Sequence, residues 1–215
     1  MKAVIFDFDG LIVDTESLWY EVFYQVMKEY GMDLSIEEFS QCIGSHDGVL
    51  YDFLDTKCGY LLDRTEVKMK TDQLYQEKIN QLMLREGVEE YLREANDLGL
   101  KIALASSSSK IWVESFLDKF NIRSYFSVIF TRDDVKVVKP DPELYIKATA
   151  ALELSPSEII VFEDSLNGLK AAKEAGLTCV VVPNPITKTL AFEGHFMKLQ
   201  SMTEIRLGEL LDKVK

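Results

Sequence analysis

The sequence has few cysteines, prolines and glycines and no long apolar run, and each of these absences excludes a class of protein. Its three cysteines, Cys42, Cys58 and Cys179, are widely spaced and form no CxxC pair, so neither a disulfide framework nor a cysteine-based zinc site is indicated. With 5 prolines and 11 glycines in 215 residues, the composition is not that of a disordered or fibrous chain. No apolar run approaches the length of a membrane span, and the first residues lack a basic segment followed by a long apolar one. We therefore expect a soluble, cytoplasmic protein.

Basic residues are also scarce. The chain has 24 Lys and Arg against 36 Asp and Glu, a formal net charge of -12, and no Lys/Arg-rich block. Nucleic acid and membrane surfaces are therefore not expected partners. A phosphorylated substrate would be repelled at long range as well, so any phosphate site needs strong local positive charge, such as a metal ion and a lysine. No long apolar stripe is left without a place in the predicted core, which favours a monomer.

What the sequence does contain is an alternation of short apolar runs with helical patterns. Strands are predicted at Ala3–Phe6, Lys101–Ala105, Ile159–Phe162 and Cys179–Val182, and a weaker one at Ser127–Phe130. Helical periodicity is found at Val88–Leu98, Lys110–Phe120, Pro142–Leu152 and Asn167–Ala175. This alternation predicts an α/β fold with a doubly wound, Rossmann-like parallel sheet, whose ligands bind beyond the carboxyl ends of the strands.

The alternation is interrupted from about Glu16 to Leu84. This stretch is acidic, aromatic and helical in pattern, with no convincing strand. We predict an inserted helical cap at residues 16–83 and an α/β core formed by residues 1–15 and 84–215. The segment after Pro183 has no clear pattern and is expected to close the fold.

Two acidic pairs follow predicted strands. Asp7 and Asp9 come directly after the first strand and are followed by Gly10, and Glu163 and Asp164 come after the strand at Ile159–Phe162. Two carboxylates at the exit of a strand are costly unless a positive group lies beside them. A magnesium ion, which prefers oxygen ligands, would remove that cost. Taken alone, aspartates at this place would equally suit a turn or a helix cap.

Hydroxyl and ammonium groups follow two other segments. Ser106 and Ser107 open a run of four serines between the second strand and a predicted helix, where hydroxyls and free helix amides could bind an anion. Capping would explain one or two of these serines. Lys139, in VVKPDPE before a proline that is expected to open a helix, could supply the fixed positive charge, although a surface lysine is the ordinary alternative. The convergence of four such segments favours a phosphate site.

In this order, DFDGLIVDT, the serine after KIALA, the lysine of VVKPDPE and the acidic pair of IIVFEDSLNG resemble the four motifs of the haloacid dehalogenase superfamily. The similarity extends from Ala3 to Gly176. The helical insertion after the first motif resembles, more narrowly, the subgroup that contains β-phosphoglucomutase and the small sugar-phosphate phosphatases.

The resemblance implies a division of roles. Asp7 would be the nucleophile, and Asp9 the general acid that protonates the leaving oxygen and then the base that activates water. Ser106 and Lys139 would bind the phosphoryl group. Magnesium would be held by Asp7, the backbone carbonyl of Asp9 and Asp164, with Glu163 supporting it directly or through water. The implied activity is that of a magnesium-dependent phosphatase that hydrolyses a small phosphorylated metabolite, a sugar phosphate or similar, through an aspartyl phosphate.

A phosphomutase like β-phosphoglucomutase is the alternative enzyme. That enzyme has a histidine where this chain has Trp19, and an arginine in a cap loop where residues 43–48 offer none and carry the acidic Asp47 instead. An acidic residue near a second phosphate is unfavourable, so a phosphatase is preferred. Glu16, Trp19 and His46 are the candidate cap residues for contact with the leaving group, although a tryptophan on an amphipathic helix more often belongs to a core.

A non-enzyme alternative is a phosphorylatable receiver module or an inactive binding relative. A receiver would share the acidic pocket, a lysine and the doubly wound sheet. It would not need an insertion of this size or an aspartate two residues after the phosphorylated one. An inactive relative would be expected to have lost one of the four motifs.

Overall fold

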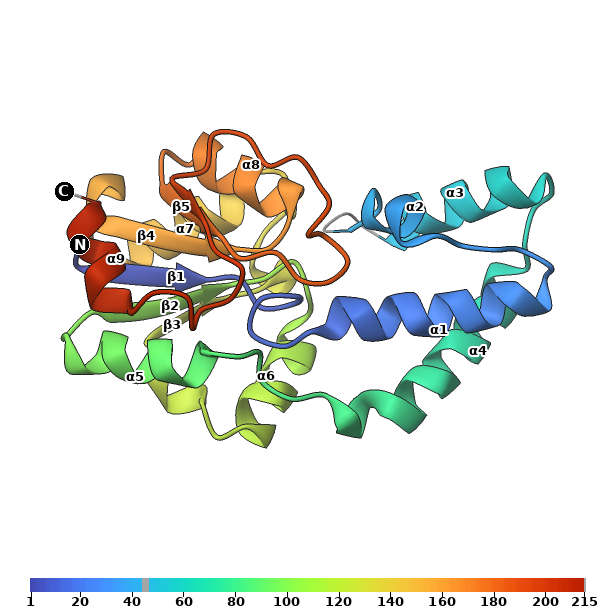
Figure 1. Ribbon diagram of the computed structural model, residues 1–215, viewed down its shortest axis with the longest axis horizontal. Coiled ribbons are helices and arrows are strands. Elements are labelled where there is room, and N and C mark those ends of the chain that lie inside the picture. Colours follow the sequence, from blue (N-terminus) through green and yellow to red (C-terminus); the bar gives the residue numbers. More distant parts are fainter. Residues whose placement is uncertain (44–46, 215) are drawn as a thin grey trace.

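A computed structural model describes residues 1–43 and 47–214, and Figure 1 shows a layered α/β part beside a helical part. The strands form one six-stranded sheet in the order β3-β2-β1-β4-β5-β6, and every neighbouring pair is parallel. They are β1 (Ala3–Phe6), β2 (Lys101–Ala105), β3 (Val128–Phe130), β4 (Ile159–Glu163), β5 (Thr178–Val181) and β6 (Met197–Lys198). The predicted doubly wound parallel sheet is confirmed.

The two faces of the sheet divide the apolar core into two layers. Alternate residues of β1 face opposite ways, so Val4 and Phe6 join one cluster while Ala3 and Ile5 join the other. Phe6 stacks on Phe162 of β4 with ring centroids 5.1 Å apart. Because both faces of the sheet are covered, the central strands are apolar throughout. This explains why continuous apolar runs in the sequence predicted them.

Helices cover both faces. The first cluster contains side chains of α5 (Val88–Asp97), α6 (Lys110–Lys119) and α9 (Leu207–Lys213), and the second those of α7 (Glu143–Leu152) and α8 (Leu166–Glu174). Short 3-10 helices lie at η2 (Arg123–Tyr125), η3 (Arg132–Asp134) and η4 (Pro156–Glu158). The four helices that the periodicity predicted in this part of the chain are confirmed to within one residue at each end.

The helical part lies in the predicted insertion. It consists of α1 (Thr15–Glu29), α2 (Ile36–Ser40), α3 (Asp47–Cys58), α4 (Arg64–Lys78) and the 3-10 helix η1 (Ile79–Gln81). These helices share an apolar cluster around Val26, Met27 and Leu34, which are fully buried, and Ile186 of the core also belongs to it. We call this part the cap and the remainder the core, while the exact domain boundaries stay a prediction.

The two chain crossings between cap and core lie side by side. Val13, just before α1, forms an antiparallel bridge with Leu84, just after the cap, and the amide of Arg85 donates to the carbonyl of Ile12 at 2.9 Å. The chain therefore leaves and re-enters the core through two paired segments rather than through loose linkers.

Two features of the core differ from the prediction. The segment after Pro183 contains β6 and α9, which its pattern did not indicate, because a strand of two residues has no measurable periodicity. In addition, Pro140 does not open a helix. Its peptide bond with Lys139 is cis, and α7 begins after Pro142.

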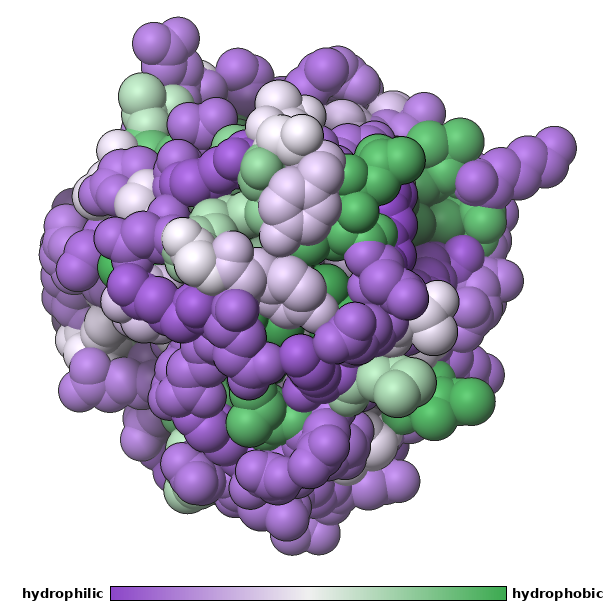
Figure 2. All heavy atoms as spheres, turned by 90° about the vertical axis from the view of Figure 1, so that its right-hand side faces the viewer, coloured by the Kyte–Doolittle hydropathy of each residue, from purple (hydrophilic) through white to green (hydrophobic). Residues whose placement is uncertain are grey.

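The outer surface of the cap is mostly hydrophilic, with small hydrophobic patches between the polar side chains (Figure 2). Among the helices of the described residues, none is both long enough and apolar enough to cross a lipid bilayer.

Candidate active site

The candidate site lies at the carboxyl ends of β1 and β4, which are neighbours at the centre of the sheet. The chain proceeds from β1 to one side of the sheet and later returns to β4 on the other side, so the crevice of a doubly wound sheet is expected here. Asp7 follows β1, and Asp164 follows β4. Both aspartates are buried, with 7% and 2% of their surface exposed.

Three buried acidic side chains converge at this point. Asp7, Glu163 and Asp164 each offer a carboxylate oxygen, and these oxygens all lie within 4.8 Å of one another. Burial raises the pKa of Asp7 above its ordinary value, although Lys139 opposes the shift. The pKa of Asp164 is raised well above its ordinary value by burial and by the neighbouring carboxylates of Asp7 and Glu163. The cluster carries more negative charge than its protein neighbours neutralise.

Lys139 provides the positive charge that the acidic sequence requires. Its ammonium group contacts the carboxylate of Asp7 and lies 2.7 Å from Oε1 of Glu163, and only 4% of the residue is exposed. Burial lowers the pKa of Lys139, but Asp7 and Glu163 outweigh this effect and raise it above its ordinary value. The lysine is therefore a fixed cation and not a solvated surface residue.

Glu163 is held on both of its oxygens. Oε1 accepts from the hydroxyl of Tyr145 at 2.6 Å in addition to Lys139, and Oε2 accepts from the hydroxyl of Ser165 at 3.1 Å and the amide of Asp164 at 3.1 Å. Gly168, in the first turn of α8, lies so close that an added Cβ would overlap the carboxylate. With its lone pairs used in this way, Glu163 is placed to position Lys139.

Asp9 points to a different set of partners. Its Oδ1 accepts from Thr15 Oγ1 at 2.9 Å and from Trp112 Nε1 at 2.9 Å. Its Oδ2 accepts from Ser108 Oγ at 2.6 Å and from Ser106 Oγ at 3.4 Å. The side chain is thus fixed by four donors from three segments of the chain, next to the acidic cluster.

The serine run is divided between several tasks. Ser106 is buried, its hydroxyl oxygen accepts from the amide of Ser108 at 3.0 Å, and its hydrogen is directed to Oδ2 of Asp9. The hydroxyl of Ser107 is buried without a hydrogen-bond partner among the described residues. Ser109 caps α6 by accepting from the amide of Trp112 at 3.3 Å. These serines offer two hydroxyl donors at the edge of the site.

Two amides in the first turn of α6 already have side-chain partners. The amide of Lys110 donates to Oδ2 of Asp133 at 2.8 Å, and that of Trp112 donates to the hydroxyl of Ser109. The anion site expected at the start of this helix stays a prediction, and these two amides are already engaged.

A residue that the sequence analysis missed completes the acidic cluster. Asn184 follows β5, is 1% exposed, and donates from Nδ2 to Oδ2 of Asp164 at 2.5 Å. Gly10, with φ of +76°, lies against both side chains, and an added Cβ would collide with them. Gly10 therefore acts by allowing a close approach in a left-handed conformation.

Arg85 binds the loops around the site together. Its guanidinium donates to the carbonyls of Gly10 at 2.5 Å, Val182 at 2.9 Å and Pro183 at 2.8 Å. Its position fixes the ends of β1 and β5 to the chain crossing from the cap.

The cap contributes Glu16 and Trp19, and His46 lies outside the described residues. Burial, Asp9 and Asp7 raise the pKa of the half-buried Glu16 to about 8. Trp19 stacks on Tyr75 with ring centroids 4.0 Å apart and joins the apolar clusters of the cap. Glu16 is therefore close to the acidic cluster, while Trp19 has the surroundings of a core residue.

The donor set fits a divalent cation with a preference for oxygen. Three carboxylates and one ammonium group leave two negative charges uncompensated, and all the ligand atoms that converge are carboxylate oxygens. Magnesium and calcium prefer such ligands, whereas zinc is usually held by nitrogen and sulfur.

The comparisons with known proteins agree with this geometry. The model of the haloacid dehalogenase-like hydrolase family matches residues 4–182. The chain belongs to this family. Its relatives include a putative phosphatase, YhcW, from Bacillus subtilis, which is 45% identical over 99% of this chain and 97% of its own length. A phosphorylated carbohydrates phosphatase from Thermotoga maritima is 32% identical over 82% of each chain.

The haloacid dehalogenase-like fold is also found among solved structures. A putative β-phosphoglucomutase from Thermotoga maritima superimposes with a TM-score of 0.76 at 27% identity, covering 99% of each chain. A solved structure with a mutase name thus superimposes on almost the entire chain, core and cap included.

Three residues around the site were not predicted from the sequence to belong to it. Asn184 lies in VVVPNP, directly after a predicted strand, and the rule that ligands gather at strand ends could have indicated it. Trp112 and Arg85 had no such signal, because each acts through a contact that only the folded chain creates.

Proposed function

We propose that this chain is a magnesium-dependent phosphatase that hydrolyses a small phosphate monoester through an aspartyl phosphate on Asp7. The observation that carries the proposal is the convergence of Asp7, Asp164 and Lys139, buried together at the carboxyl edge of the sheet. An acidic protein needs such a concentration of positive charge to accept a phosphate. The phosphatase names of the relatives support the same activity.

The magnesium ion would be held by Asp7, Asp164 and the backbone carbonyl of Asp9, and it would neutralise charge on the phosphate. Lys139 would bind a phosphoryl oxygen and keep the carboxylate of Asp7 oriented. Ser106 and Ser107 would donate their hydroxyls to the remaining oxygens. Binding at several oxygens positions phosphorus for in-line attack, which is the main requirement of phosphoryl transfer.

The reaction would proceed in two displacements. In the first, the carboxylate of Asp7 forms a bond to phosphorus while the ester bond to the leaving oxygen breaks, and Asp9 gives that oxygen a proton. In the second, Asp9 takes a proton from water, the water oxygen bonds to phosphorus, and the bond to Asp7 breaks. The products are an alcohol and inorganic phosphate, and both aspartates return to their first state.

We propose a sugar or polyol phosphate as the substrate, which agrees with the name of the carbohydrate phosphatase relative. The cap side of the site presents a carboxyl group, Glu16, whose pKa is raised by burial, Asp9 and Asp7, and which could form a hydrogen bond with a substrate hydroxyl. A phosphomutase is the second candidate, because a putative β-phosphoglucomutase shares the fold.

The proposal is tested with a panel of hexose phosphates, hexitol phosphates, glycerol phosphate and p-nitrophenyl phosphate. Phosphate release should be continuous over many turnovers and should require magnesium. The variant Asp7→Asn should lose activity by about 10³-fold or more, and Asp9→Asn by about 10²- to 10⁴-fold. Near-normal turnover by Asp7→Asn would refute the mechanism, and isomerisation without phosphate release would favour the mutase.

A further inference from the structure

Trp112 makes a directional contact with the proposed acid and base. This residue lies in the first turn of α6, and its indole Nε1 donates to Oδ1 of Asp9 at 2.9 Å. An indole N–H can only donate, so Oδ1 must act as an acceptor. Thr15 donates to the same oxygen, so a proton carried by Asp9 is favoured on Oδ2, whose partners Ser106 and Ser108 are hydroxyls that donate to the carboxylate and can rotate when it is protonated. These serines border the proposed phosphate site.

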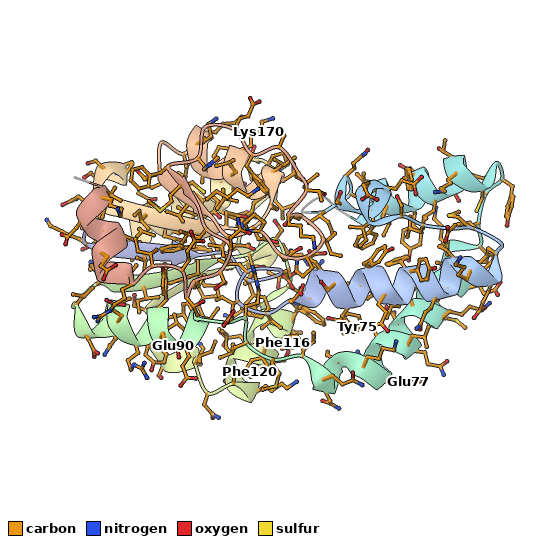
Figure 3. The ribbon with its side chains drawn as sticks, in the orientation of Figure 1. Tyr75, Glu77, Glu90, Phe116, Phe120 and Lys170 are labelled. Carbon is orange, nitrogen blue, oxygen red and sulfur yellow. The ribbon has the colours of Figure 1, made fainter. Side chains whose placement is uncertain are left out.

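The indole itself is fixed by rings from both parts of the molecule. It lies edge-on to Phe116 of α6, with centroids 5.0 Å apart, and tilted against Tyr75 of α4, with centroids 5.6 Å apart. In Figure 3, Tyr75 lies in the cap between α1 and α4, and Phe116 lies on α6 in the core. The ring that reaches Asp9 is therefore held between a core side chain and a cap side chain.

Tyr75 is well suited to such a bracing role. It is 1% exposed, it stacks on Trp19, and it shares an apolar cluster with Leu18 and Val22 of α1. Trp112 is the member of this cluster that α6 contributes. The position of the Trp112 indole thus depends on the cap helices through the direct contact between the rings of Tyr75 and Trp112.

We propose that Trp112 is a positioning residue that presents Oδ2 of Asp9 to the leaving oxygen, and that Tyr75 of the cap holds Trp112 in place for this task. The inference rests on the proposed function, because it takes Asp9 as the acid that protonates the leaving group. The hydrogen bond of the indole goes to the side chain of Asp9, so Trp112 would act through Asp9. A purely structural role for Trp112 would affect all substrates equally, whereas a positioning role depends on how much the leaving group needs a proton.

The test compares two leaving groups. An alkoxide requires protonation as it departs, but p-nitrophenolate leaves without it near neutral pH, and kcat/KM reports the steps up to departure. We expect Trp112→Phe to lower kcat/KM by about tenfold for the fastest alkyl phosphate of the panel and by about twofold or less for p-nitrophenyl phosphate. The ratio of the two values is independent of the folded fraction, so partial unfolding of the variant does not affect it.

Ser115→Ala is the matched control on the same helix. Ser115 is exposed and donates to the carbonyl of Trp112 at 2.7 Å, so its removal perturbs α6 but leaves the indole in place. Both rates should stay at the wild-type level. If Trp112→Phe lowers the two kcat/KM values by the same factor, or changes neither, the positioning role is overturned.

The link to the cap is tested at Tyr75. Tyr75→Leu removes the ring and should reduce the alkyl-to-aryl ratio by about threefold or more, whereas Tyr75→Phe keeps the ring and should preserve the ratio. An unchanged ratio in Tyr75→Leu would overturn the bracing role. Asp9→Asn, assayed in parallel, distinguishes a failure of the proposed function from a failure of the positioning role of Trp112. Full alkyl phosphatase activity in that variant would refute the proposed function itself, while its loss together with a wild-type ratio in Trp112→Phe would refute only this inference.

Discussion

The side-chain amide of Asn184 joins Asp164 to the loop after β5. Its nitrogen donates to Asp164 at 2.5 Å, and its oxygen accepts from the amides of Ile186 at 2.7 Å and Thr187 at 3.0 Å. Because backbone amides only donate, these two bonds determine which end of the amide faces Asp164. Asn184 thereby fixes the orientation of a proposed metal ligand.

Replacement of Asn184 should weaken magnesium binding. We expect Asn184→Ala to reduce the affinity by about 10- to 100-fold, as measured by titration calorimetry and by the magnesium dependence of activity, because groups that orient metal ligands have effects of this size. Asn167→Ala removes a side-chain amide that donates to Ile43 at 3.1 Å instead, and serves as the control. Equal affinities for the wild type and Asn184→Ala would contradict this role.

Gly168 should tolerate no side chain, because an added Cβ would overlap the carboxylate of Glu163. We expect Gly168→Ala to lower the free energy of unfolding by about 1–3 kcal/mol and to reduce activity through displacement of Lys139. Urea unfolding and steady-state kinetics measure the two effects. In Gly99→Ala, which has a φ of +69° and open space around it, only the backbone strain should remain, without loss of activity. A Gly168→Ala variant as active as Gly99→Ala would disprove the steric argument.

Stability should depend on pH through Glu16. Its pKa is raised from 4.5 to about 8 in the folded state, chiefly by burial, so the folded chain retains a proton that the unfolded chain has released between these values. The free energy of unfolding therefore decreases as the pH rises through this range. We expect a smaller decrease for Glu16→Gln between pH about 5.5 and about 8.5 in urea unfolding.

Glu158 provides a control of opposite sign. Lys2 lowers the pKa of Glu158 to about 2, so its stabilising contribution is present above 4.5 and is lost as the pH falls toward that value. Glu158→Gln should consequently show the same slope as the wild type between pH about 5.5 and about 8.5, offset by a constant loss of stability, and approach the wild type only in acid. A Glu16→Gln slope identical to that of Glu158→Gln in this range would contradict the prediction.

Loss of the Arg85 guanidinium should destabilise the junction of cap and core. Arg85→Met leaves the carbonyls of Gly10, Val182 and Pro183 without a donor, and we expect a loss of about 3 kcal/mol in the free energy of unfolding. Arg85→Lys should recover only part of this loss, because an ammonium group cannot reproduce the planar fork. Arg206→Met, at an exposed ion pair of 3.6 Å with Glu94, should change stability by less than about 0.5 kcal/mol. Similar effects of Arg85→Met and Arg206→Met on stability would argue against a stabilising role for the three hydrogen bonds of Arg85.

Sequence reasoning located the sheet and the charged centre of the site for one physical reason. Strands buried on both faces are continuous apolar runs, and parallel strands deliver whatever follows them to the same edge. Asp7 and Asp164 could therefore be placed together without coordinates, whereas Lys139 was assigned to the site by the need for a positive charge and by the family resemblance. The amide of Asn184 follows the same rule but sits after a strand whose continuation had no clear pattern.

Side-chain contacts between segments far apart in the sequence could not be predicted from local patterns. Trp112 reaches Asp9 across 103 positions of sequence, and nothing in its helical pattern distinguishes that contact from an ordinary core ring. The hydrogen bond from the amide of Lys110, at the start of α6, to Asp133 could not be predicted for a related reason, because it joins residues 23 positions apart. Such pairings are decided by tertiary structure and not by local pattern.

The ring stack around Tyr75 also gives the protein an optical property. Trp19 and Trp112 are the two tryptophans of the chain, and both contact Tyr75, one from the cap and one from the core. The tryptophan fluorescence of the molecule thus originates at the boundary between its two parts. Any rearrangement of that boundary during turnover can be followed in the unlabelled protein.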